Sequence, residues 1–83
     1  MSKVLVEIDI PIAQKVFEVF LPLHLTGFEL LPLIIRTAED LTDGIFSASE
    51  ETTLSRKEDG SLLNLNLPVW RLEVKNGEKF VLI

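Results

Sequence analysis

The chain has 83 residues, 47% of them apolar, which is enough for one small domain. Thirteen acidic against eight basic residues give a net charge of −5, which disfavours nucleic acid as a partner because phosphate binding needs clustered lysine and arginine. With no cysteine and one histidine, neither a disulfide framework nor a zinc site is expected, and we expect no metal and no cofactor.

No leader or membrane span is predicted. The N-terminal stretch MSKVLVEIDIP carries Glu7 and Asp9 within its apolar run, so it lacks the unbroken core of a secretory signal. Residues 16–35 form the most apolar window, but they contain two prolines and three ionisable side chains. We therefore expect a cytoplasmic protein that does not insert into a membrane.

Two strands are predicted at the start of the chain. Residues 3–10 and residues 15–22 both alternate between apolar and polar positions, with the turn PIAQ between them. Pro11 ends the first strand and Pro22 ends the second. An antiparallel hairpin follows from this order.

A helix is predicted to begin after Thr26, because Glu29 three places later completes the spacing of a capping box. Apolar residues then recur at three- and four-residue steps, which indicates one stripe for packing against a sheet. The stripe consists of Leu30, Leu31, Ile34, Ile35, Ala38 and Leu41. Pro32 interrupts it, so either the helix is kinked there or its regular part begins near Pro32.

The second half of the chain is less regular. Residues 42–52 are mostly polar and predict a loop. Residues 53–56 and 61–65 predict a second hairpin around the turn Asp59-Gly60. Residues 67–74 predict a connecting turn or short helix.

Two features close this half. We expect the connection 67–74 to pack Trp70 and Leu72 inward. Asn76-Gly77 is a further turn, and residues 80–83 predict the final strand, held within the sheet.

This order resembles ubiquitin-like β-grasp proteins over nearly the full length of the chain. The resemblance implies an α+β fold, with one main helix on one face of a four- to five-stranded mixed sheet, and a single domain over residues 1–83. LPLHLTGFELLPLIIRTAEDL and VKNGEKFVLI resemble the strand-to-helix passage and the ending of the YukD/EsaB family. Glu78, Pro32 and the length of the loop 42–52 depart from that family's pattern.

The YukD/EsaB proteins are small ubiquitin-like accessories of type VII secretion in Gram-positive bacteria. The resemblance implies a non-catalytic protein that binds a component of such machinery. Conjugated modifiers and sulfur carriers of this fold need a flexible Gly-Gly tail, whereas this chain ends in Leu82 and Ile83. We therefore expect neither transfer through the C-terminus nor an enzyme.

The outer face of the sheet is the predicted binding site. If one helix covers one face, the alternate side chains form an exposed apolar cluster, and such clusters mark interaction sites. Shielding by loops is the competing interpretation, and for Trp70 the alternative is a lid on the core. The predicted interface residues are Leu5, Val16, Phe20, Val81, Ile83 and Trp70.

Other polar residues predict no chemistry. His24 has no nucleophile or second histidine nearby in the sequence, so it is interpreted as a turn residue. Glu39 and Asp40 are adjacent on the helix and point to different faces. The acidic pairs at 50–51 and 58–59 are interpreted as loop residues, and Asp43-Gly44 as a turn without calcium-loop spacing.

Three alternatives remain open at this stage. The same outer face could form a homodimer, because apolar sheet surfaces self-associate. The chain could instead be the small β-grasp subunit of a multicomponent oxygenase. A sulfur-carrier relative without the Gly-Gly tail is the third alternative.

Overall fold

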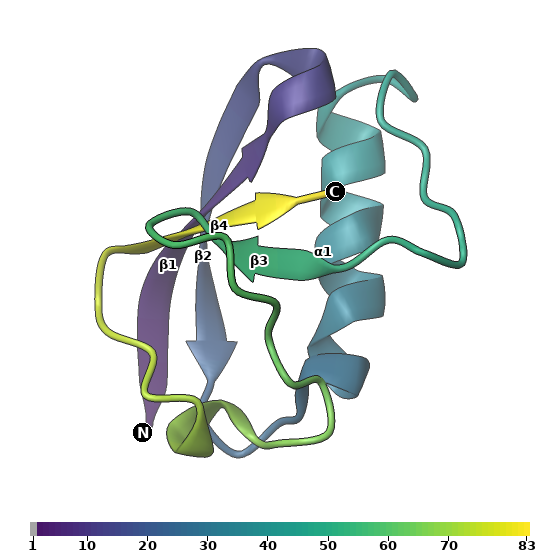
Figure 1. Ribbon diagram of the computed structural model, residues 1–83. Coiled ribbons are helices and arrows are strands. Elements are labelled where there is room, and N and C mark those ends of the chain that lie inside the picture. The colour runs from purple at the N-terminus through teal and green to yellow at the C-terminus, as the bar shows by residue number, and fades with distance from the viewer. Residues whose placement is uncertain (1) are drawn as a thin grey trace.

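One helix crosses one face of a four-stranded mixed sheet in the computed structural model, which describes residues 2–83 (Figure 1). The strands are β1 (Lys3–Ile10), β2 (Lys15–Pro22), β3 (Leu54–Arg56) and β4 (Glu78–Leu82), the helix is α1 (Gly27–Leu41), and the short 3₁₀ helices are η1 (Pro11–Ala13) and η2 (Val69–Arg71). The sheet order is β2-β1-β4-β3. This is the predicted ubiquitin-like β-grasp fold, with four strands.

The first hairpin is confirmed along its whole length. β1 and β2 pair antiparallel from Lys3 opposite Pro22 to Ile10 opposite Lys15. Gln14 closes the turn in the left-handed region, at φ 52°. Alternate β1 residues are buried, as period two predicts. They are Val4, Val6, Ile8 and Ile10.

β4 is an interior strand. It pairs parallel with β1, from Val6 opposite Glu78 to Asp9 opposite Val81, and antiparallel with β3. It starts two residues earlier than predicted, at Glu78, because the preceding turn already bonds to β1. Asn76 Oδ1 accepts from the backbone N–H of Leu5 at 3.0 Å, and the N–H of Gly77 donates to the Leu5 carbonyl at 2.7 Å.

The capping box at the start of α1 is confirmed. The backbone N–H of Glu29 donates to Thr26 Oγ1, and Glu29 Oε1 accepts from the Thr26 N–H at 2.9 Å. The hydrogen bonds from the Thr26 backbone and side chain lower the pKa of the Glu29 carboxyl. The helix begins at Gly27 and continues through Pro32, so a start near Pro32 is wrong.

The buried stripe of α1 is narrower than predicted. Leu30, Ile34 and Ala38 are buried at four-residue spacing, whereas Leu41 is exposed. Leu41 lies at the end of the helix, where the chain turns away, and Phe46 from the following loop fills the core instead. Thr42 orders this loop, because its Oγ1 donates to the Ala38 carbonyl at 2.9 Å and accepts from the Phe46 N–H at 3.1 Å.

The predicted return strand at residues 61–65 is wrong. Only Leu62 forms a bridge, opposite Ser55, although the turn at Asp59-Gly60 is present. The chain leaves the sheet here because Leu65 packs on the start of the helix. The Leu65 carbonyl accepts from the N–H of Phe28 at 3.0 Å, and Leu65 lies against Gly27.

This contact makes Gly27 the most restricted glycine of the fold. A Cβ at Gly27 would lie 2.6 Å from Leu65 Cδ2 and 2.8 Å from Leu65 Cα. The backbone of residue 65 would have to move, which outweighs the gain of about 1 kcal/mol that alanine brings to a helix.

We predict that Gly27→Ala lowers the free energy of unfolding by about 1–3 kcal/mol. Urea unfolding followed by circular dichroism measures the change. Arg36→Ala, at an exposed position of the same helix, is the control and should change stability little. A Gly27→Ala protein as stable as the wild type would show that the loop does not press on the helix.

Candidate functional site

The outer face of the sheet, on the side away from α1, carries three cross-strand rows. Pairing places Phe20 beside Leu5 in the first row. The second row consists of Glu18, Glu7 and Lys79, on β2, β1 and β4. The third row consists of Val16, Asp9 and Val81 on the same strands.

The first row forms an apolar patch with a cation over it. Phe20 is 53% exposed, and Leu5 is half-buried beside it. The Lys3 ammonium lies 4.4 Å from the centre of the Phe20 ring, within the range of a cation–π interaction. An aromatic ring with a lysine at its edge is a composition typical of interface anchors.

The second row divides the predicted apolar cluster. Glu7 and Glu18 are direct cross-strand partners of like charge, which destabilises a sheet, while Lys79 on the other side of Glu7 offsets part of that repulsion. The structure therefore brings Leu5 and Phe20 together but separates both from Val16 and Val81.

The third row is mixed. Val16 is exposed and Val81 half-buried, on either side of Asp9. Lys57 Nζ lies 2.9 Å from Asp9 Oδ2, and this hydrogen bond and the charge of Asp9 raise the pKa of Lys57. The pair spans β4 and so covers part of the sheet beside Val81.

Ile83 lies beyond the three rows, just after β4. It exchanges two backbone hydrogen bonds with Thr53, at 2.9 and 3.1 Å, so the pairing of β3 and β4 extends to it. Its side chain is exposed and lines an apolar hollow together with Ile12 and Phe46.

The prediction that Trp70 packs inward is wrong. In η2 the buried residue is Val69, and Trp70 is 63% exposed. The cause lies in the backbone, because the Val69 N–H donates to the Leu25 carbonyl and the Trp70 N–H to the Leu23 carbonyl. These bonds turn Val69 into the core and Trp70 to the surface.

Trp70 borders a hollow with Ser2, Leu23 and His24. His24 is exposed in the turn after β2, as predicted. No residue of the outer sheet face lines this hollow, so Trp70 forms a second surface, distinct from the three rows.

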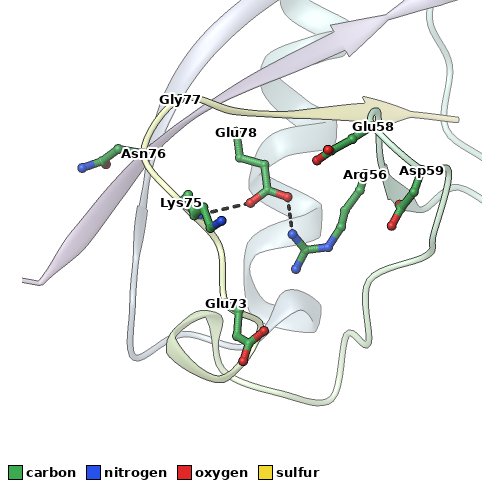
Figure 2. A pocket seen from close by; sticks show the side chains of 8 residues that line it. All are labelled: Arg56, Glu58, Asp59, Glu73, Lys75, Asn76, Gly77 and Glu78. Carbon is green, nitrogen blue, oxygen red and sulfur yellow. Dashed lines mark hydrogen bonds and ion pairs between the residues drawn. The ribbon is translucent and has the colours of Figure 1, made fainter.

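A polar hollow lies where β3 ends and β4 begins (Figure 2). Arg56 ion-pairs with the Glu78 carboxylate and donates to the Leu72 carbonyl, and the other Glu78 oxygen accepts from the Lys75 N–H at 3.0 Å. Arg56 thus joins β3, β4 and the end of η2. The sequence carried no motif for this contact, because its three partners are 16 to 22 residues apart.

The remaining acidic pairs of the chain serve local structure. Glu39 Oε2 accepts from the Ala48 N–H at 3.2 Å, which ties the loop after α1 to the helix. Asp59 accepts from the N–H and Oγ of Ser61, and these hydrogen bonds lower the Asp59 pKa. Between residues 2 and 83, no three histidine or acidic side chains gather as metal ligands do.

No helix within residues 2–83 combines the length and the apolarity that crossing a bilayer demands.

Comparison with known proteins identifies the fold. No protein-family model matches the chain, and no curated protein sequence matches it. Among solved structures, it is similar to the ubiquitin-like domain of the type VII secretion protein EccD1 of Mycobacterium tuberculosis, with a TM-score of 0.79 at 14% identity, covering 100% of this chain and 99% of that one.

Two further solved structures agree. The EccD5 ubiquitin-like domain of Mycobacterium xenopi has a TM-score of 0.83 at 19% identity, over 100% of this chain and 94% of that one. A ubiquitin-like protein of Trypanosoma brucei has a TM-score of 0.70 at 21% identity, over 98% and 93% of the two chains. At such identities the likeness establishes the ubiquitin-like fold.

We predict that Arg56→Lys lowers the free energy of unfolding by about 1–2 kcal/mol, because lysine keeps the charge but lacks the planar fork that bonds two acceptors. Chemical unfolding measures the loss. Lys57→Met, which breaks the neighbouring exposed ion pair with Asp9, should cost less. Equal losses for the two variants would contradict a clamp at Arg56.

Proposed function

From the premise of a ubiquitin-like fold, we propose that this protein is a non-catalytic, cytoplasmic accessory that binds a protein component of a bacterial type VII-like secretion system. Docking takes place through the outer face of the sheet. The observation that carries the proposal is the exposed Phe20 beside Leu5 on that face, with Lys3 above the ring.

Two kinds of similarity support the secretion context. Two of the similar solved structures are ubiquitin-like domains of type VII secretion proteins. The strand-to-helix passage and the final turn and strand resemble the YukD/EsaB family in sequence. The placement of this chain in that family is part of the proposal.

The composition of the face favours a partner that is both apolar and charged. The apolar pair at Phe20 lies beside the row of Glu18 and Glu7, so a complementary surface brings an apolar side chain and a basic one about one row apart. A second copy of the same face would place acidic rows near each other. We therefore propose a heterologous partner ahead of a homodimer.

We predict that Phe20→Glu and Val81→Glu each reduce recovery of the partner about tenfold or more in pull-downs from the cells that encode the protein. Mass spectrometry identifies and quantifies the captured proteins. Phe28→Glu is the matched control, since Phe28 is equally exposed but lies on α1, away from the face.

The variants must unfold cooperatively for the comparison to hold, which thermal melts verify. An unchanged set of captured proteins in both outer-face variants would remove the docking surface. Capture of a diiron hydroxylase in place of secretion components would move the protein to the oxygenase alternative.

A further inference from the structure

The free edge of β2 is a second candidate binding surface, independent of the outer face. β2 is at one end of the sheet order, so a single neighbour, β1, pairs with it. The strand has eight residues and no bulge in its register with β1. A long, regular edge is a template for another strand.

The register shows which backbone groups of β2 are free. The Leu23 N–H donates to the Ser2 carbonyl, and in an antiparallel pair bonded and non-bonded positions alternate from there. The odd-numbered residues of β2 therefore bond to β1. Val16, Glu18 and Phe20 direct their N–H and C=O groups outward from the sheet, which leaves three donors and three acceptors in a line.

A groove lies beneath this edge, between β2 and α1. Its volume is about 250 Å³. Leu33 on its helix side is exposed, although it lies in the middle of α1. Six residues that line it are Val19 and Leu21 from β2, and Leu30, Leu33, Ile34 and Thr37 from α1. A strand added to β2 would place alternate side chains into this groove, where apolar ones fit.

The opposite side of an added strand meets the outer face. There Glu18 is exposed and has a like charge, Glu7, as its partner on β1. Between residues 2 and 83, Glu18 forms no ion pair. A lysine or arginine directly across from Glu18 would supply the opposite charge that β1 does not.

A second copy of the chain fits this edge poorly. In the antiparallel register that pairs all three free positions with one another, Val16 lies opposite Phe20 and Glu18 lies opposite Glu18. That register sets two like charges against each other. A shift in one direction brings Pro22, which has no N–H, opposite Val16. A shift in the other direction takes Phe20 beyond the strand, to Gln14.

We propose that the β2 edge and the β2–α1 groove bind an extended peptide segment by strand addition. The segment alternates, with apolar side chains in the groove and basic side chains on the outer face, one of them opposite Glu18. The proposal does not depend on the outer-face docking above, since its main contacts are the backbone of β2 and the wall of α1.

The test uses three synthetic peptides and the whole ¹⁵N-labelled protein. The probe is acetyl-Lys-Val-Lys-Ile-Lys-Val-Lys-amide. The second peptide has glutamate at each lysine position, and the third has the composition of the probe in the order Lys-Lys-Val-Ile-Val-Lys-Lys. Affinity is measured by NMR titration, and backbone amide exchange is measured with and without the probe.

We expect the probe to bind at least about tenfold more tightly than either other peptide. It should slow amide exchange at Val16, Glu18 and Phe20 and shift the signal of Leu33. Glu18→Lys should reverse the preference between the lysine and glutamate peptides, whereas Glu51→Lys, an equal charge change in an exposed loop, should not.

Glu18→Pro should abolish binding while leaving the fold intact, because its missing N–H is one that points away from β1. Equal binding of the probe and the reordered peptide would reduce the effect to net charge and overturn the proposal. Shifts confined to other surfaces, no binding at millimolar peptide, or protection of the β2 edge that rises with protein concentration alone would also overturn it, the last by assigning the edge to a second copy.

Discussion

β4 lies between β1 and β3, and Phe80 packs beside its partner Ile8 on the face that α1 covers, with both side chains fully buried. This parallel contact joins the two ends of the described chain. Without it, the first hairpin would have one covered face and no neighbour, and β3, which is only three residues long, would have no strand to pair with. The Asn76 side chain and the Gly77 N–H extend the contact by one residue, at Leu5.

The same contact determines which surfaces are available for binding. Because β4 takes the inner place beside β1, β2 is left at the edge, with three backbone positions that no strand fills. Because one helix covers one face, Phe20, Glu18 and Val16 appear together on the opposite face, in rows that alternate apolar and acidic character. The two candidate surfaces are thus the edge and one face of the same strand, so β2 is the element through which the fold meets other molecules.

Local rules predicted the elements whose signal lies within a few residues. Alternation predicted β1 and β2 to the residue, and Thr26 with Glu29 predicted the start of α1. Failures occurred where distant contacts decide. Leu65 looks like a strand residue, but Gly27 leaves room for it against the helix, and Trp70 is exposed because two carbonyls of residues 23 and 25 hold η2 in place. The division of the outer face by Glu7 and Glu18 follows from the hairpin register, which the alternating pattern already contained.

Amide hydrogen exchange of the native protein tests the central contact most directly. If β4 is an interior strand, the amides of Phe80, Val81 and Leu82 exchange only through global unfolding, as slowly as that of Ile8 on β1. The amides of Val16, Glu18 and Phe20 on the open edge then exchange far faster. Rapid exchange throughout β4, with the first hairpin still protected, would contradict the account.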